Sequence, residues 1–207
     1  MLSIQEEVLS CGTIRFSDTY NSFCVGIVDI VNSTQIIARL SNSELSTYYG
    51  MFLNSMASMT EKYGAIVVKN VGDSILYYFP DTADAADKEA LVKCLEVSLK
   101  MIELHDELNK KLALEGLPTV DYRVSCDYGQ VIKAKSRSSI YEDIFGTTVN
   151  LCARINKLTF PNTVVIGDDL YTIVKGFSQY AFQELNPCSL GLWLDYPLYL
   201  INRGRGH

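Results

Sequence analysis

The sequence predicts a mixed α+β fold in which helices cover a mainly antiparallel β-sheet. Segments rich in β-branched and aromatic residues recur along the chain and are bounded by Gly, Pro and Asp, as strands are. Between them lie segments whose apolar residues recur at three- and four-residue steps, which is typical of amphipathic helices. The expected order of elements is β-α-α-β-β-α-β-β-α-β-α-β-β.

The length and composition of the chain suit one domain. Of its 207 residues, 48% are hydrophobic and 20% are charged, an ordinary balance for a globular protein. We expect a polar N-terminal lead-in over residues 1–20 and a single folded domain over residues 21–203. Six cysteines, none in a CxxC pair, are expected to be buried free thiols in a reducing cytoplasm.

The charge and hydropathy of the chain argue against several classes of protein. The formal net charge of −6 argues against a nucleic-acid-binding protein, which usually carries a basic face. No apolar run reaches the roughly 18 residues of a membrane helix, so we expect no membrane association. The N-terminus lacks the basic start and apolar core of a signal peptide, so we expect a cytoplasmic location.

An almost wholly apolar run over residues 22–30 is expected to be a central strand, buried on both faces. Its single charge, Asp29, lies at the C-terminal end, where open sheets tend to place ligands. Good helix N-caps follow at Asn32, Ser33 and Thr34, just before an expected helix. A strand-end carboxylate followed by free N–H groups of a helix is suited to holding a metal-bound phosphate.

Residues 43–63 are expected to form an amphipathic helix ended by a glycine. A β-hairpin is expected over residues 67–79, where two strand-like runs flank the pair Gly72-Asp73. Lys69 and Asp73 are charged residues close to the tip of this otherwise apolar hairpin. A half-buried charge needs a partner, a metal or a ligand, although a solvated hairpin tip remains the alternative.

The second half of the chain continues the interleaved pattern. A helix is expected over residues 84–114, with His105 in a structural role, because two histidines in the whole chain disfavour a histidine metal site or a Ser-His-Asp triad. The remaining elements are expected as two strands over 121–132 joined around Gly129, a polar loop over 133–142, a helix from Gly146 onward, a strand over 163–166, a helix over 168–175, and strands near 180–185 and 196–201.

Six polar residues are candidates for a site. Asp29 and Asp73 each end or turn an apolar strand, so the two carboxylates are suited to holding two divalent cations. Lys69 and Asp143 offer a hydrogen-bond donor and an acceptor, as recognition of a base edge requires.

Asn150 and Arg154 are four residues apart, so they project from one helix face about a turn apart. Arg is the favoured group for charge that builds on a phosphoryl oxygen. Each of these residues has a structural alternative: Asp143 as a helix N-cap, Arg154 in a surface ion pair and Asn150 as an exposed amide.

Three segments together resemble one family. They are residues 28–34 (VDIVNST), 69–76 (KNVGDSIL) and 141–154 (YEDIFGTTVNLCAR). In order and internal spacing they are similar to the motifs of the class III nucleotidyl cyclases, the adenylate and guanylate cyclase catalytic domain. Arg123 and Gly129 also fall where the family has an Arg…Gly strand-turn-strand signature. The resemblance covers residues 22–201, nearly the whole chain.

The resemblance implies a ferredoxin-like βαββαβ core and a head-to-tail homodimer with two active sites at its interface. It implies that Asp29 and Asp73 bind two Mg²⁺ or Mn²⁺ ions per active site, with the carbonyl of Ile30 assisting. The backbone around residues 32–34 would hold the triphosphate of a nucleoside triphosphate substrate. The 3′-OH would attack the α-phosphate in line and release pyrophosphate.

The other subunit would complete each site. By the resemblance, the partner's Lys69 and Asp143 recognise the base, its Asn150 orients the ribose and its Arg154 stabilises the transition state at the α-phosphate. Lys69 and Asp143 match the adenine-recognising pair of the family, which points to ATP as substrate and cyclic AMP as product.

Two alternatives to an adenylate cyclase stay open. A pyrimidine cyclase would convert UTP or CTP to cyclic UMP or cyclic CMP in phage defence, because Lys69 or Asp143 can also bond to a pyrimidine edge. A catalytically silent cyclase-like regulatory domain is the second, although all six candidate residues are retained. A related palm-fold enzyme that makes cyclic dinucleotides is disfavoured, because it would carry a Gly-Gly-acidic-Glu-Phe hairpin where this chain has Asn-Val-Gly-Asp-Ser.

The chain departs from the family pattern at two places. The glycine that usually follows the Arg-containing strand is replaced within residues 124–127 (VSCD). The segment 189–197 lacks the lysine that often contacts the terminal phosphates. Another cation, such as Lys133, Lys135 or Arg137, would then bind them.

Overall fold

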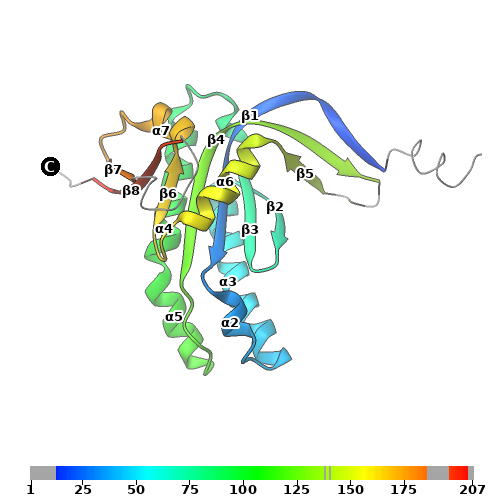
Figure 1. Ribbon diagram of the computed structural model, residues 1–207, viewed down its shortest axis with the longest axis vertical. Coiled ribbons are helices and arrows are strands. Elements are labelled where there is room, and N and C mark those ends of the chain that lie inside the picture. The colour runs from blue at the N-terminus through cyan, green and yellow to red at the C-terminus, as the bar shows by residue number, and fades with distance from the viewer. Residues whose placement is uncertain (1–12, 138, 140, 186–195, 205–207) are drawn as a thin grey trace, which may run out of the picture.

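The computed structural model describes residues 13–137, 139, 141–185 and 196–204, which form a sheet with helices on both faces (Figure 1). The sheet has eight strands in the order β2-β3-β1-β4-β6-β8-β7, with β5 paired to β4 beside this path. Every pair is antiparallel except that of β4 with β6. The predicted α+β class with a mainly antiparallel sheet is confirmed.

The first part of the chain forms the predicted ferredoxin-like βαββαβ core, in which β4, β1, β3 and β2 are neighbours in that order. Its elements are β1 (Ile14–Ile30), α3 (Asn42–Lys62), β2 (Ile66–Val71), β3 (Ser74–Phe79), α4 (Lys88–Glu103) and β4 (Tyr122–Ser136).

Shorter elements join and extend this core. They are α2 (Ser33–Ile37), the 3₁₀ helix η1 (Pro80–Ala83), α5 (His105–Leu114), β5 (Glu142–Phe145), α6 (Thr147–Leu158), β6 (Val164–Gly167), α7 (Asp168–Val174), β7 (Tyr180–Leu185) and β8 (Leu198–Arg203). No helix of the described residues is long and apolar enough to cross a membrane.

The two faces of the sheet carry separate cores, because successive side chains of a strand point to opposite faces. Cys24 and Val28 of β1 belong to the larger core, which α3, α4, α5 and α7 cover. Val25 and Ile27 belong to a smaller core on the other face, together with Cys152 of α6. In Figure 1, α6 crosses the face of the sheet that is turned to the viewer. The candidate site lies on this second face.

Strands β1 and β4 are longer than the sequence predicted. β1 begins at Ile14, inside the polar lead-in, and β4 runs without a break from Tyr122 through Gly129 to Ser136. The predicted turn at Gly129 and the predicted loop from residue 133 are therefore wrong. Because Gly129 has no side chain, α6 can pack closely against β4 at this position. A Cβ there would lie 2.6 Å from Thr148 Oγ1. With β5, the two strands extend as an arm from the body (Figure 1).

The predicted helix over residues 84–114 is two helices that meet at Leu104. The hydroxyl of Tyr122 donates to the carbonyl of Met101 at 2.5 Å, and this is the acceptor that the N–H of His105 would use in a continuous helix. The imidazole of His105 bonds to Asp121 at 3.0 Å. His105 thus fastens α5 to the start of β4, which agrees with the predicted structural role.

The cysteines that the structure describes are free and buried, as predicted. They are Cys24, Cys94, Cys126 and Cys152, and burial raises the pKa of Cys24 and of Cys152. Cys11 and Cys188 lie outside the described residues.

Candidate active site

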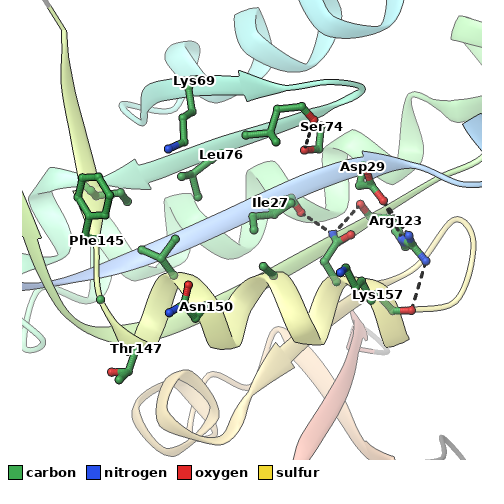
Figure 2. Close-up of a pocket in the computed structure, with 16 residues that line it drawn as sticks. Ile27, Asp29, Lys69, Ser74, Leu76, Arg123, Phe145, Thr147, Asn150 and Lys157 are labelled. Carbon is green, nitrogen blue, oxygen red and sulfur yellow. Dashed lines mark hydrogen bonds and ion pairs between the residues drawn. The ribbon is translucent and has the colours of Figure 1, made fainter. Parts of the chain in front are cut away.

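A pocket of about 740 Å³ opens between helix α6 and the hairpin of β2 and β3 (Figure 2). Strand β1 forms its floor through Ile27, and β5 closes one end. Figure 2 places Lys69 and Phe145 at that end, and Asp29 with Arg123 at the other. The residues that line the pocket are Ile27, Asp29, Lys69, Val71, Ser74, Leu76, Arg123, Ile144, Phe145, Gly146, Thr147, Val149, Asn150, Ala153, Asn156 and Lys157.

Asp29 lies near the C-terminal end of β1, directly opposite Arg123 of β4. Arg123 donates from Nη2 at 2.7 Å and from Nε at 3.2 Å, and both bonds go to Oδ2 of Asp29. Oδ1 has no hydrogen-bond partner among the described residues. Burial raises the pKa of Asp29, the hydrogen bond from Arg123 opposes this, and the charge of Asp73 adds to the rise.

Asp73 is the second residue of the two-residue turn between β2 and β3. Gly72, the first turn residue, has φ +63°, which a type II′ turn requires at that position and which favours glycine. Ser74, next to Asp73, pairs with Asp29 across β3 and β1, so the turn brings Asp73 to the same end of the pocket. In the part of the chain that is described, the Asp73 carboxylate forms no hydrogen bond or ion pair.

The donors at this end suit a small divalent cation. Asp29 Oδ1 and the Asp73 carboxylate are the available hard oxygen ligands, and Mg²⁺ typically takes one or two carboxylates and completes its shell with water and substrate phosphates. Within the described ranges, no three His, Cys, Asp or Glu side chains cluster into a closed metal site. Ile30 follows Asp29 as the last residue of β1, so its carbonyl lies at the same strand end.

Asn32, Ser33 and Thr34 form the start of α2, just beyond the end of β1. Asn32 adopts the left-handed conformation with φ +55°, and its side chain does not cap the helix. None of the three residues lines the pocket. The structure therefore places this predicted phosphate segment next to the carboxylate end but outside the pocket wall.

Lys69 and Asp143 meet at the opposite end of the pocket. The Nζ of Lys69, on β2, lies 2.5 Å from Oδ2 of Asp143, on β5. The other oxygen of Asp143 accepts the N–H of Ile144 at 2.8 Å, which orients the carboxylate. Lys69 Nζ also lies 5.7 Å from the ring centroid of Phe145. The predicted donor and acceptor are brought together within one chain.

Helix α6 carries the last two predicted residues. Asn150 lines the pocket, whereas Arg154, one turn further along, is exposed and does not line it. Arg154 forms no hydrogen bond or ion pair with any residue that the structure describes. Asn156, which is buried, anchors the helix by donating to the carbonyl of Ile27 at 3.0 Å and to that of Arg123 at 3.4 Å.

The sequence pattern does not predict the places of Arg123, Phe145, Asn156 and Lys157 in the site. The register of β1 with β4 places Arg123 beside Asp29, and sequence alone does not give that register. Lys157 follows Asn150 by seven residues, so the helical period would have found it on the same face. Asn156, six residues on, points about a third of a turn away, and only the packing of α6 on the sheet brings it to the site.

The cations predicted as substitutes for the missing lysine lie in the arm. Lys133 Nζ lies 3.9 Å from Glu142 and over the rings of Phe23 and Tyr78, at 5.5 and 5.2 Å. Residues 189–195 of the segment that lacks the lysine lie outside the described residues. The guanidinium beside the candidate metal carboxylates belongs to Arg123 instead.

Comparisons with known proteins identify the family and the fold. A family model described as the adenylate and guanylate cyclase catalytic domain matches residues 16–201. An adenylate cyclase of Streptomyces coelicolor is 28% identical over 144 residues, which cover 69% of this chain and 31% of that protein. The chain spans less than half the length of the curated relatives that it matches.

Solved structures share the fold. The adenylyl cyclase CyaB from P. aeruginosa superposes with a TM-score of 0.78 at 19% identity, over 90% of this chain and 96% of that one. The guanylate cyclase domain of RhGC from Catenaria anguillulae, in complex with GTP, superposes with a TM-score of 0.74 at 18% identity, over 90% of this chain and 100% of that one.

Proposed function

The chain belongs to the adenylate and guanylate cyclase catalytic domain family, and from this premise we propose that it converts ATP to 3′,5′-cyclic AMP and pyrophosphate. The observation that carries the proposal is the pocket itself. Its two ends carry the two halves that a shared site would need: Asp29 lies at one end, and Lys69, paired with Asp143, lies at the other, with Asn150 on the wall. In a head-to-tail dimer, Lys69, Asp143 and Asn150 of one copy would face Asp29 and Asp73 of the other.

Asp29 and Asp73 hold two Mg²⁺ or Mn²⁺ ions in this proposal, with the carbonyl of Ile30 assisting. When bound, these ions supply charge neutralisation at the phosphates and activation of the 3′ oxygen. The hydrogen bond from Arg123 opposes the rise in pKa that burial gives Asp29, and because Arg123 bonds only to Oδ2 it leaves Oδ1 for a cation. The unpaired carboxylate of Asp73 fits the same role.

The triphosphate lies along the end of β1. Backbone N–H groups around Asn32, Ser33 and Thr34 hold its oxygens. Arg123 is the cation that we assign to the phosphates in place of the missing lysine, because its guanidinium already lies at the carboxylate end and is fixed there by Asp29 and by the carbonyl of Lys157 at 3.3 Å. Arg is suited to this because its donors form a rigid fork.

The base binds at Lys69 and Asp143. Adenine presents an amino group that donates and a ring nitrogen that accepts, so Asp143 accepts from the first and Lys69 donates to the second. Lys69 Nζ and Asp143 Oδ2 lie 2.5 Å apart. When the base binds between the two side chains, hydrogen bonds to the base replace this ion pair. Both are partly exposed, so exchanging that pair costs little.

The working enzyme is a homodimer in which each site uses two chains. Arg154 has no partner among the described residues and lies outside the pocket of its own chain, so it suits a triphosphate held by the partner's Asp29 and Asp73. The 3′ oxygen forms a bond to the α-phosphorus in line with the leaving oxygen, and the bond to the β-phosphate breaks to release pyrophosphate. Asn150 orients the ribose, and Arg154 stabilises charge on the α-phosphoryl oxygens.

The direct test identifies the product. Purified protein is incubated with Mn²⁺ and, separately, ATP, GTP, CTP and UTP, and cyclic products are identified by mass. We expect cyclic AMP to dominate and an Asp73→Asn variant to make none. A folded protein that makes no cyclic nucleotide from any of the four contradicts the proposal. Cyclic UMP, CMP or GMP as the main product contradicts the assignment of the base alone.

A further inference from the structure

Phe145 is an aromatic residue that the site described so far does not use. It ends strand β5 and lines the pocket beside Lys69 (Figure 2). Its side chain is 38% exposed, whereas other aromatic residues on this face of the sheet, such as Phe23 and Tyr78, are buried. A partly exposed ring on a pocket wall can stack on a flat ligand.

The chain holds this ring in place from two sides. Phe16 of the arm packs against it edge-on, with ring centroids 5.6 Å apart and planes at 64°. Gly146, the next residue, has φ +151°, and a Cβ there would lie 2.8 Å from the carbonyl oxygen of Gln130. Only glycine therefore permits this turn from β5 into α6. The turn fixes the direction in which Phe145 leaves the strand.

The ring also lies next to the polar groups that are assigned to the base. Asp143 and Phe145 are two residues apart on β5, so their side chains leave the same side of the strand. Lys69 reaches both, at 2.5 Å from the Asp143 carboxylate and 5.7 Å from the Phe145 centroid. A flat heterocycle that lies on the ring thus has its edge beside one donor and one acceptor.

We propose that Phe145 is the stacking platform for the base of the nucleoside triphosphate, and so a residue that sets affinity in the same site. This inference rests on the proposed function. Lys69 and Asp143 distinguish bases by their edges, whereas Phe145 binds the face that every base presents. Because a purine overlaps a phenyl ring over more area than a pyrimidine, Phe145 favours purine nucleotides.

The test measures binding without turnover. α,β-Methylene ATP and α,β-methylene UTP are titrated calorimetrically, in the presence of Mg²⁺, into wild type, Phe145→Leu and Phe145→Tyr. Phe160→Leu is the matched control, because Phe160 is 50% exposed but lies outside the pocket. Inorganic tripolyphosphate is titrated as a ligand that has no base.

We expect Phe145→Leu to weaken binding of the ATP analogue about 5- to 150-fold, the range that base–aromatic stacking spans. Binding of the UTP analogue falls by a smaller factor. Phe145→Tyr and Phe160→Leu bind like wild type, and tripolyphosphate binds all four proteins equally. Equal affinity of Phe145→Leu and wild type for the ATP analogue overturns the inference, as does an equal loss for tripolyphosphate.

The outcomes separate the two proposals. If wild type makes no cyclic product but binds the ATP analogue, and Phe145→Leu weakens that binding, the cyclase proposal fails and the stacking inference stands. If wild type makes cyclic AMP and Phe145→Leu binds normally, the stacking inference alone fails. A wild type that neither binds the ATP analogue nor makes product overturns both.

Discussion

At the scale of single residues, the pocket is notable for which charges are paired and which are not. Arg123 neutralises Asp29 within the chain, and Lys69 is paired with Asp143. Asp73 has no partner among the residues described, although a charged side chain normally gains one when it is half-buried. A ligand that brings cations and phosphates would supply the missing interaction.

The Lys69–Asp143 pair should matter for binding and not for stability. Both side chains are partly exposed, at 42% and 31%, so we expect Lys69→Met to change the free energy of unfolding by less than about 1 kcal/mol. The same change should raise KM for ATP tenfold or more, because a hydrogen bond from a charged donor is lost. Urea denaturation and steady-state kinetics measure the two effects.

A matched control is Lys93→Met, which removes an exposed pair with Glu89 on α4 at 3.0 Å. Lys93 has the same exposed fraction as Lys69 but lies far from the pocket in the fold, so KM should not change. Equal kinetic effects of the two variants would count against base recognition by Lys69.

Asp127 should make stability depend on pH. It is fully buried, accepts a bond from Tyr196 Oη at 2.8 Å, and its pKa is raised to about 6, mainly by burial. The native carboxyl therefore keeps its proton up to about pH 6, whereas the unfolded one loses it near pH 4. The free energy of unfolding then falls as pH rises through this window, by up to about 3 kcal/mol.

Asp127→Asn removes this titration and leaves the other ionisable groups in place. The difference in unfolding free energy between wild type and Asp127→Asn should fall from pH 4 to pH 6 and level off above. Chemical denaturation across that range measures it, with the exposed Glu115→Gln as control. Parallel curves for wild type and Asp127→Asn would show that the buried carboxyl does not titrate there.

At the scale of elements, glycines mark where the backbone packs most closely. Gly26 of β1 lies against the buried ring of Tyr77, and an added Cβ would overlap two atoms of the ring and its hydroxyl oxygen. Gly50 of α3 has open space, with its nearest neighbour, Asn54 Nδ2, 4.0 Å from an added Cβ.

Replacing these two glycines by alanine should give effects of opposite sign. Gly26→Ala forces Tyr77 out of a packed core, which costs about 1–3 kcal/mol or more. Gly50→Ala lies within a helix, where alanine is better than glycine by about 0.5–1 kcal/mol. Thermal or urea unfolding of both variants measures the difference. A Gly26→Ala protein as stable as wild type would mean that β1 and β3 pack differently.

The interleaved hydrophobic pattern predicted most elements, because a helix or strand that buries one face must repeat its apolar residues at its own period. The hydrophobic pattern did not predict segments that bury neither face. The arm segment of β1 from Ile14 to Tyr20 is largely exposed, so its sequence carries no strand signal. At Gly129 the sequence predicts a turn that the structure does not have, because glycine permits turns and close approaches alike and its identity does not distinguish them.

The candidate site was predictable in part for a similar reason. Asp29, Asp73 and Lys69 stand out because each interrupts an apolar strand run, and Asn150 follows from helical spacing. The positions of Arg123 and Phe145 at the pocket depend on the register in which β1, β4 and β5 pair. Such contacts between distant segments have no signature in local sequence.

At the scale of the whole molecule, the two faces of the sheet differ in how they are covered. Helices α3, α4, α5 and α7 bury one face, whereas α6 is the only helix of the described residues that covers the other, and it leaves the pocket open along β2 and β3. The open face carries the candidate residues at both of its ends. A second copy of the chain, placed head to tail, would cover this face and bring the carboxylate end of one copy to Arg154 of the other.

The most direct test of this account mixes two inactive variants. Asp73→Ala lacks a metal carboxylate, and Arg154→Ala lacks the transition-state cation, so each homodimer should be inactive. In a heterodimer one site receives both defects and the other receives neither. An equal mixture should therefore recover about a quarter of the wild-type cyclase activity. Heterodimers that form, as seen by native mass spectrometry, yet show no more activity than the two parents would contradict an active site shared between chains.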